Sequence, residues 1–124
     1  MFTKTTTPTK EVLDEIKLRD KTCVYCGKEF DKSHLARNRN DWDETEHLNH
    51  RKNWDSVGDY MREGKPVSEI VARCCHQCNS NRSDMALLAW FKTDYCKEKD
   101  INYSTVDLVV KKYIDKYEKG NEKI

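Results

Sequence analysis

Two pairs of cysteines in this chain have the spacing of a metal-binding site. Cys23 and Cys26 are separated by two residues, and Cys75 and Cys78 repeat that spacing later in the chain. A Cys-x-x-Cys turn lets both sulfurs reach one ion, and two such turns complete the tetrahedral four-thiolate site typical of structural zinc. We therefore predict one structural Zn²⁺ held by these four cysteines. Such an ion has no open position for a substrate, so function is expected elsewhere.

The sequence leaves other roles open for these cysteines. The two pairs could be redox-active thiols, or all four could be ordinary buried thiols. Cys74 could replace Cys75 as a ligand, although the spacing from Cys74 to Cys78 is looser. We assign Cys96 to a helix face as a small buried hydrophobe. The matched spacing of the two pairs favours the zinc site.

The composition limits the class of protein. The 124 residues suit a single domain, 36% of them are charged, and the formal net charge is only +1. The chain has few apolar residues and six cysteines, which favours a fold stabilised by a bound metal ion over one stabilised by a large hydrophobic core. Because the net charge is close to zero, the protein as a whole has no positive electrostatic field that would attract nucleic acid. With no membrane-length apolar run and no signal-peptide pattern at the start, we expect a cytoplasmic protein without a membrane partner.

Hydrophobic spacing and capping residues predict short elements around the cysteine pairs. We expect residues 9–124 to form one α+β domain, with a core at about 19–83 followed by C-terminal helices at about 84–119. Before the second cysteine pair we expect, in chain order, a disordered tail at 1–8, a helix at 9–19, a polar loop at 31–45, an extended segment at 46–50, a helix at 54–64 and a strand at 67–73. After that pair we expect a helix capped by Ser83 and a last helix with a capping box at Ser104.

The order of these features resembles the HNH endonucleases of the ββα-metal class. Members of that family place a zinc knuckle, then an Asp-His pair, then a second knuckle of the form CxxCNxxK. The corresponding stretches here are CVYCG, LNHRK and CHQCNSNR. The spacing of His47-Leu48-Asn49-His50 is also similar to that in phage recombination endonucleases of this class. The resemblance covers roughly half of the chain and implies a small ββα-metal core with flanking N- and C-terminal helices.

The resemblance also implies a function and its residues. The protein would be a metal-dependent HNH endonuclease that hydrolyses DNA, of phage or bacterial origin, leaving 5′-phosphate and 3′-hydroxyl ends. His50 would be the catalytic general base that takes a proton from water. Asn49 and Asn79 would offer oxygen ligands to Mg²⁺ or Mn²⁺, which polarises the scissile phosphate. Arg82 would contact a DNA phosphate.

Two departures from the family pattern keep a second function open. This chain has Asn49 where the family has Asp, and a neutral amide binds a hard cation more weakly than a carboxylate. Glu46 or Asp43 could supply the missing carboxylate, and His47 could be an alternative base. The family's middle Asn is also replaced, by the Ser-Glu-Ile run at 68–70. The alternative is a non-catalytic zinc-stapled module, derived from an HNH nuclease, that binds nucleic acid or protein.

Overall fold

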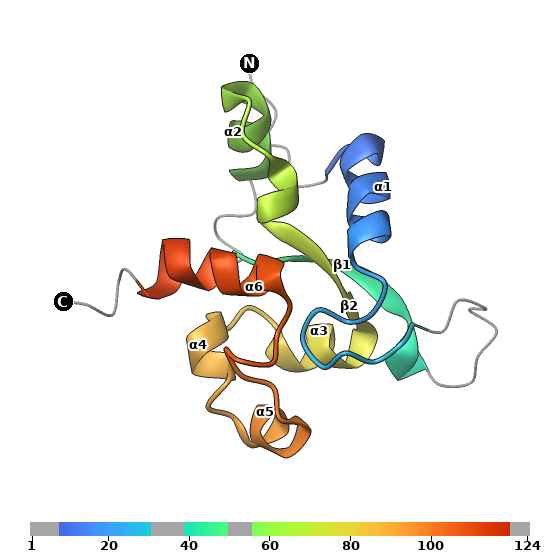
Figure 1. The fold of residues 1–124 in the computed structure, drawn as a ribbon, viewed down its shortest axis with the longest axis vertical. Helices are drawn as coiled ribbons and strands as arrows, with labels where there is room; N and C mark the ends of the chain where they lie inside the picture. Colours follow the sequence, from blue (N-terminus) through green and yellow to red (C-terminus); the bar gives the residue numbers. More distant parts are fainter. Residues whose placement is uncertain (1–7, 31–38, 50–55, 120–124) are drawn as a thin grey trace.

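The computed structural model describes residues 8–30, 39–49 and 56–119, and its architecture is α+β, as predicted (Figure 1). Within these ranges, no helix is long and apolar enough to cross a membrane. The elements in chain order are α1 (Lys10–Arg19), the 3₁₀ turn η1 (Arg39–Asp41), β1 (Asp43–His47), α2 (Ser56–Glu63), the 3₁₀ turn η3 (Val67–Glu69), β2 (Val71–Cys75), α3 (His76–Arg82), α4 (Leu87–Trp90), α5 (Asp94–Lys99), α6 (Leu108–Tyr113) and the π-helical turn η4 (Ile114–Glu118).

The two strands form a small antiparallel sheet at the centre of the molecule (Figure 1). The register runs from Asp43 opposite Cys75 to His47 opposite Val71, and the Leu48 amide extends the ladder by donating to the Ile70 carbonyl at 2.9 Å. Strand β2 is mostly buried, whereas β1 is largely half-buried and polar. The predicted polar loop at 31–45 is therefore wrong at its end, because β1 begins at Asp43.

The N-terminal helix follows the prediction closely, and the later helices follow it less well. Thr9 caps α1, since its hydroxyl accepts the Val12 amide at 3.3 Å. Ser83 was predicted to begin a helix, but it ends α3 in the left-handed region, with φ of 55°. Ser104 likewise lies in a turn, and Asp107 precedes α6. The expected helix after Ser83 is two short ones, α4 and α5, and Thr93 caps the second by accepting the Cys96 amide.

The last turn of the described chain holds α4 in place. The Glu118 carboxylate, in η4, accepts the backbone amides of Leu87 and Leu88, both at 2.9 Å. These amides lie in the first turn of α4, where helical N–H groups have no partner inside the helix and a negative charge is favourable. The packing of η4 on α4 therefore has an electrostatic component as well as an apolar one.

Trp90 links the C-terminal helices to the cysteine region. Its ring is fully buried and meets the Tyr25 ring edge-on, with the centroids 4.9 Å apart. On another side it stacks on Tyr95 at 6.0 Å, and its indole N–H donates to the Asn81 side chain at 2.8 Å. Tyr25 lies inside the first Cys-x-x-Cys turn, so this aromatic group couples that turn to α3, α4 and α5.

Arg82 is part of the core and has only 1% of its surface exposed. Its guanidinium donates to the carbonyls of His47 (3.2 Å) and Leu48 (2.8 Å), and forms an ion pair with Glu46 at 3.4 Å. Tyr25 donates its hydroxyl to the same carboxylate. Burial raises the pKa of Glu46, and the charge of Arg82 opposes that shift. The predicted contact between Arg82 and a DNA phosphate is corrected here, because the guanidinium is used inside the protein.

We predict that Arg82→Ala destabilises the domain by about 3–5 kcal/mol, since it leaves the buried Glu46 carboxylate without its charge partner. Urea unfolding monitored by circular dichroism measures this change. The matched control is Arg62→Ala, because Arg62 is an exposed arginine of α2 paired with Asp59. The control should stay within about 0.5 kcal/mol of the wild type. Equal stability of the two variants would contradict the structural role of Arg82.

Candidate metal centre

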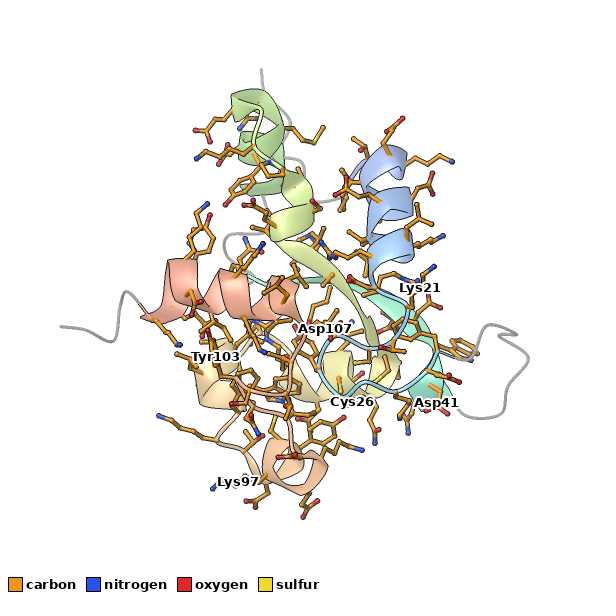
Figure 2. The ribbon with its side chains drawn as sticks, viewed as in Figure 1. Lys21, Cys26, Asp41, Lys97, Tyr103 and Asp107 are labelled. Atoms are coloured by element: carbon orange, nitrogen blue, oxygen red, sulfur yellow. The ribbon has the colours of Figure 1, made fainter. Side chains whose placement is uncertain are left out.

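The four predicted zinc ligands come together in one cluster. The sulfurs of Cys23, Cys26, Cys75 and Cys78 all lie within 4.8 Å of one another, and three of the four residues are buried. Figure 2 shows the loop that carries Cys26 passing beside α3, and the second cysteine pair lies at the junction of β2 and α3. The prediction that these residues can hold a metal ion is confirmed. Four sulfur donors suit the borderline-soft Zn²⁺ better than a hard cation.

The first pair lies on a tight turn that follows α1. The Cys23 amide donates to the Lys28 carbonyl, and the Gly27 amide donates back to the Cys23 carbonyl, both at 2.9 Å. Gly27 has a φ of +77°, which favours glycine at the position where the chain reverses. The Val24 amide donates to the Arg73 carbonyl at 3.2 Å, so the turn is also fastened to β2.

The second pair lies where β2 becomes α3. Cys75 caps the helix, and its sulfur accepts the Cys78 amide at 3.5 Å. The His76 amide donates to the Trp42 carbonyl at 2.8 Å, which fixes the first residue of α3 against the segment before β1. The Tyr95 hydroxyl, from α5, lies 3.3 Å from the Cys78 sulfur. Tyr95 is a contact of the cluster that the cysteine spacing did not predict, because α5 is distant from both cysteine turns in the sequence.

The sulfurs share protons unequally. A hydrogen bond with Cys23, followed by others within the cluster, lowers the pKa of Cys26. The pKa of Cys75 falls to about 7, again with the hydrogen bond from Cys23 as the largest cause. The pKa of Cys23 is raised, chiefly by its hydrogen bond with Cys26. The pKa of Cys78 is also raised, chiefly by its hydrogen bond with Cys23, and a divalent ion bound by the four sulfurs would displace the protons that remain.

The remaining cysteines are not ligands. Cys74 and Cys96 are both buried, and neither belongs to the cluster. Successive residues of a strand point to opposite faces, so Cys74 and Cys75 cannot both face the same ion. Cys75, and not Cys74, therefore belongs to the cluster. The buried position predicted for Cys96 is confirmed.

The two asparagines predicted to hold a catalytic ion have different surroundings. The Asn79 amide donates to the Glu44 carboxylate at 2.8 Å, near the beginning of β1. Asn49 follows Leu48 at the other end of the strand and is only 8% exposed. A strand rises about 3.3 Å per residue, so about 13 Å separates Glu44 from Leu48. The ion site predicted for Asn49 and Asn79 therefore stays a prediction, and His50 lies outside the described residues.

The carboxylates that could have replaced the missing Asp are also engaged elsewhere. Glu46 is buried against Arg82, and Asp43 forms an ion pair with Arg73. His47 ends β1, half-buried. The acidic residue that does face Asn79 is Glu44, which sequence reasoning missed. Side chains alternate between the two faces of a strand, so Glu44 lies on the same face of β1 as Glu46, the face that α3 covers. This alternation is the signal in the sequence that could have identified Glu44.

Comparison of the chain with protein-family models, with curated proteins and with solved structures found no match. The HNH resemblance therefore stays a prediction. The structural finding is a four-cysteine cluster at the junction of β2 and α3, with polar residues between β1 and α3 beside it.

We predict that Cys23→Ala releases zinc and unfolds the domain, because metal binding and folding are coupled in sites of this kind. Zinc content by native mass spectrometry and secondary structure by circular dichroism measure the two effects together. Cys74→Ala is the matched control, since it removes a buried thiol outside the cluster. This control should retain zinc and the folded spectrum. A folded Cys23→Ala protein without zinc would contradict the proposed role of the ion.

Proposed function

We propose that this protein is a zinc-stapled, divalent-metal-dependent endonuclease that cleaves DNA, with His50 as the general base. The observation that carries the proposal is the packing of β1, β2 and α3 as two antiparallel strands and a helix, with one Cys-x-x-Cys turn before the strands and the other at the start of the helix. This is the order of parts that the HNH resemblance implies. The segment Asn49-His50 follows β1, between the two knuckles.

The chain that leads to His50 is held firmly. The Leu48 amide donates to the Ile70 carbonyl, and the Leu48 carbonyl accepts from Arg82, so β1 is anchored to both β2 and α3. A catalytic base is positioned more precisely when the strand before it is rigid, and this anchoring of β1 supports the proposal of general-base catalysis. Mg²⁺ or Mn²⁺ belongs to the proposal as the ion required for cleavage. We assign no ligands to this ion.

A second candidate is a non-catalytic zinc-stapled module that binds nucleic acid or protein. Two observations favour it specifically. Arg82 is buried in the core, and Asn79 is hydrogen-bonded to Glu44. Both residues would act at the catalytic site in the nuclease. In this second candidate the strands and α3 only present a surface, and His50 has no chemical role.

The test is cleavage of supercoiled plasmid by the zinc-loaded protein with Mg²⁺ or Mn²⁺. The wild type should nick or linearise the plasmid, and His50→Ala should lose about 10²-fold or more of the rate, as expected for removal of a general base. His47→Ala tests the alternative base. His34→Ala is the matched control for loss of a histidine elsewhere, and its rate should equal that of the wild type.

The outcomes separate the two candidates. Loss of cleavage in His50→Ala alone supports the nuclease and its base. Loss in His47→Ala alone would move the base to the end of β1. Equal cleavage in all four preparations would contradict both assignments. No cleavage by the wild type, with either metal and with single- or double-stranded DNA, would contradict the nuclease and favour the binding module.

A further inference from the structure

A second group of potential metal ligands lies between β1 and α3, outside the cysteine cluster. The Glu44 carboxylate contacts two side chains of α3 through its two oxygens. One oxygen lies 2.9 Å from His76 Nδ1, and the other lies 2.8 Å from Asn79 Nδ2. All three side chains are partly exposed, so the group is open to solvent on one side.

The backbone fixes these three residues relative to one another. Glu44 is held in the ladder opposite Cys74. His76 and Asn79 are three residues apart on α3 and therefore lie on the same side of the helix. The first turn of α3 is held by the Cys75 cap. The Ser80 hydroxyl lies 3.3 Å from His76 Nε2, which gives the imidazole ring a second contact and orients it.

The spacing of the donor atoms fits a coordination shell. Two donors about 2.1 Å from one ion and at a right angle to each other lie about 3 Å apart. The 2.9 Å between His76 Nδ1 and the Glu44 carboxylate is close to that value, as is the 2.8 Å between that carboxylate and the Asn79 side-chain amide. An ion can lie between His76 Nδ1 and the Glu44 carboxylate in place of their hydrogen bond. The two ends of the Asn79 amide are assigned only from hydrogen bonding, and rotation presents its oxygen in place of its nitrogen.

The chemistry of the group selects one class of ion. Imidazole nitrogen with carboxylate and amide oxygens suits first-row transition ions better than Mg²⁺ or Ca²⁺, which prefer oxygen alone. The Glu44 carboxylate supplies one negative charge. The neighbouring four-thiolate cluster is also negative when it holds Zn²⁺, which adds to the attraction for a second cation.

We propose that Glu44, His76 and Asn79 bind a first-row divalent transition ion, separate from the zinc held by the four cysteines. Among the described residues three protein donors meet here, and solvent supplies the remaining ligands. The group is distinct from the Asn49 and Asn79 pair that the HNH resemblance implied. The proposal concerns metal binding and stands whether or not the protein cleaves DNA.

Isothermal titration calorimetry of the zinc-loaded protein, with Ni²⁺ as the titrant, tests the proposal. The wild type should bind one Ni²⁺ per chain without losing zinc, as checked by mass spectrometry. Glu44→Gln and His76→Ala should each weaken binding by more than about tenfold, because loss of even an outer-shell partner costs about 10–100-fold. Asn79→Asp should tighten binding, since it adds a charged ligand.

Two controls complete the test. Glu98→Gln removes an exposed carboxylate from α5 and should bind Ni²⁺ as the wild type does. His34→Ala removes a histidine that neither proposal uses and should also leave binding unchanged. The proposal is overturned if the wild type binds no Ni²⁺, or if folded, zinc-loaded Glu44→Gln and Asn79→Asp proteins both bind as the wild type does. Loss of binding in His34→Ala alone would equally overturn it. None of these results depends on cleavage of DNA.

Discussion

The meeting of four cysteine sulfurs is the contact on which the other parts of this structure depend. The first pair lies on the turn after α1, and the second lies where β2 becomes α3. The chain has few apolar residues to hold these segments together by burial alone, so a metal ion bound by all four sulfurs supplies stability that the core does not. Because Cys75 also caps α3, the same site determines where that helix begins.

Buried polar contacts extend this organisation from the metal centre. Arg82, at the end of α3, contacts Glu46 and the carbonyls of His47 and Leu48, while Trp90 packs between Tyr25 and Tyr95. Helix α3 thus contributes to three environments: the sulfur cluster through Cys78, the core through Arg82, and the partly exposed group around Glu44. The proposed second metal site and the proposed nuclease both use the boundary between β1 and α3, and both depend on the cysteine cluster that fixes α3.

Sequence reasoning succeeded where local spacing determines local geometry. The two Cys-x-x-Cys turns and the Thr9 cap follow from the residues themselves. It failed where tertiary contacts decide the outcome. Strand β1 is too polar to be recognised alone, and it forms because buried β2 supplies its partner. Arg82 looked like a surface cation, but its burial depends on Glu46, thirty-six residues earlier in the chain. The role of Glu44 required the register of the sheet, which spacing alone does not give.

The most direct test of this account is X-ray absorption at the zinc edge of the purified protein. The account predicts one zinc per chain surrounded by four sulfurs at about 2.3 Å, with no nitrogen or oxygen ligand. A mixed shell of sulfur and nitrogen would mean that a histidine replaces one of the cysteines. A protein that is folded and contains no bound metal would contradict the central claim, because the four sulfurs would then have to be held together by packing alone.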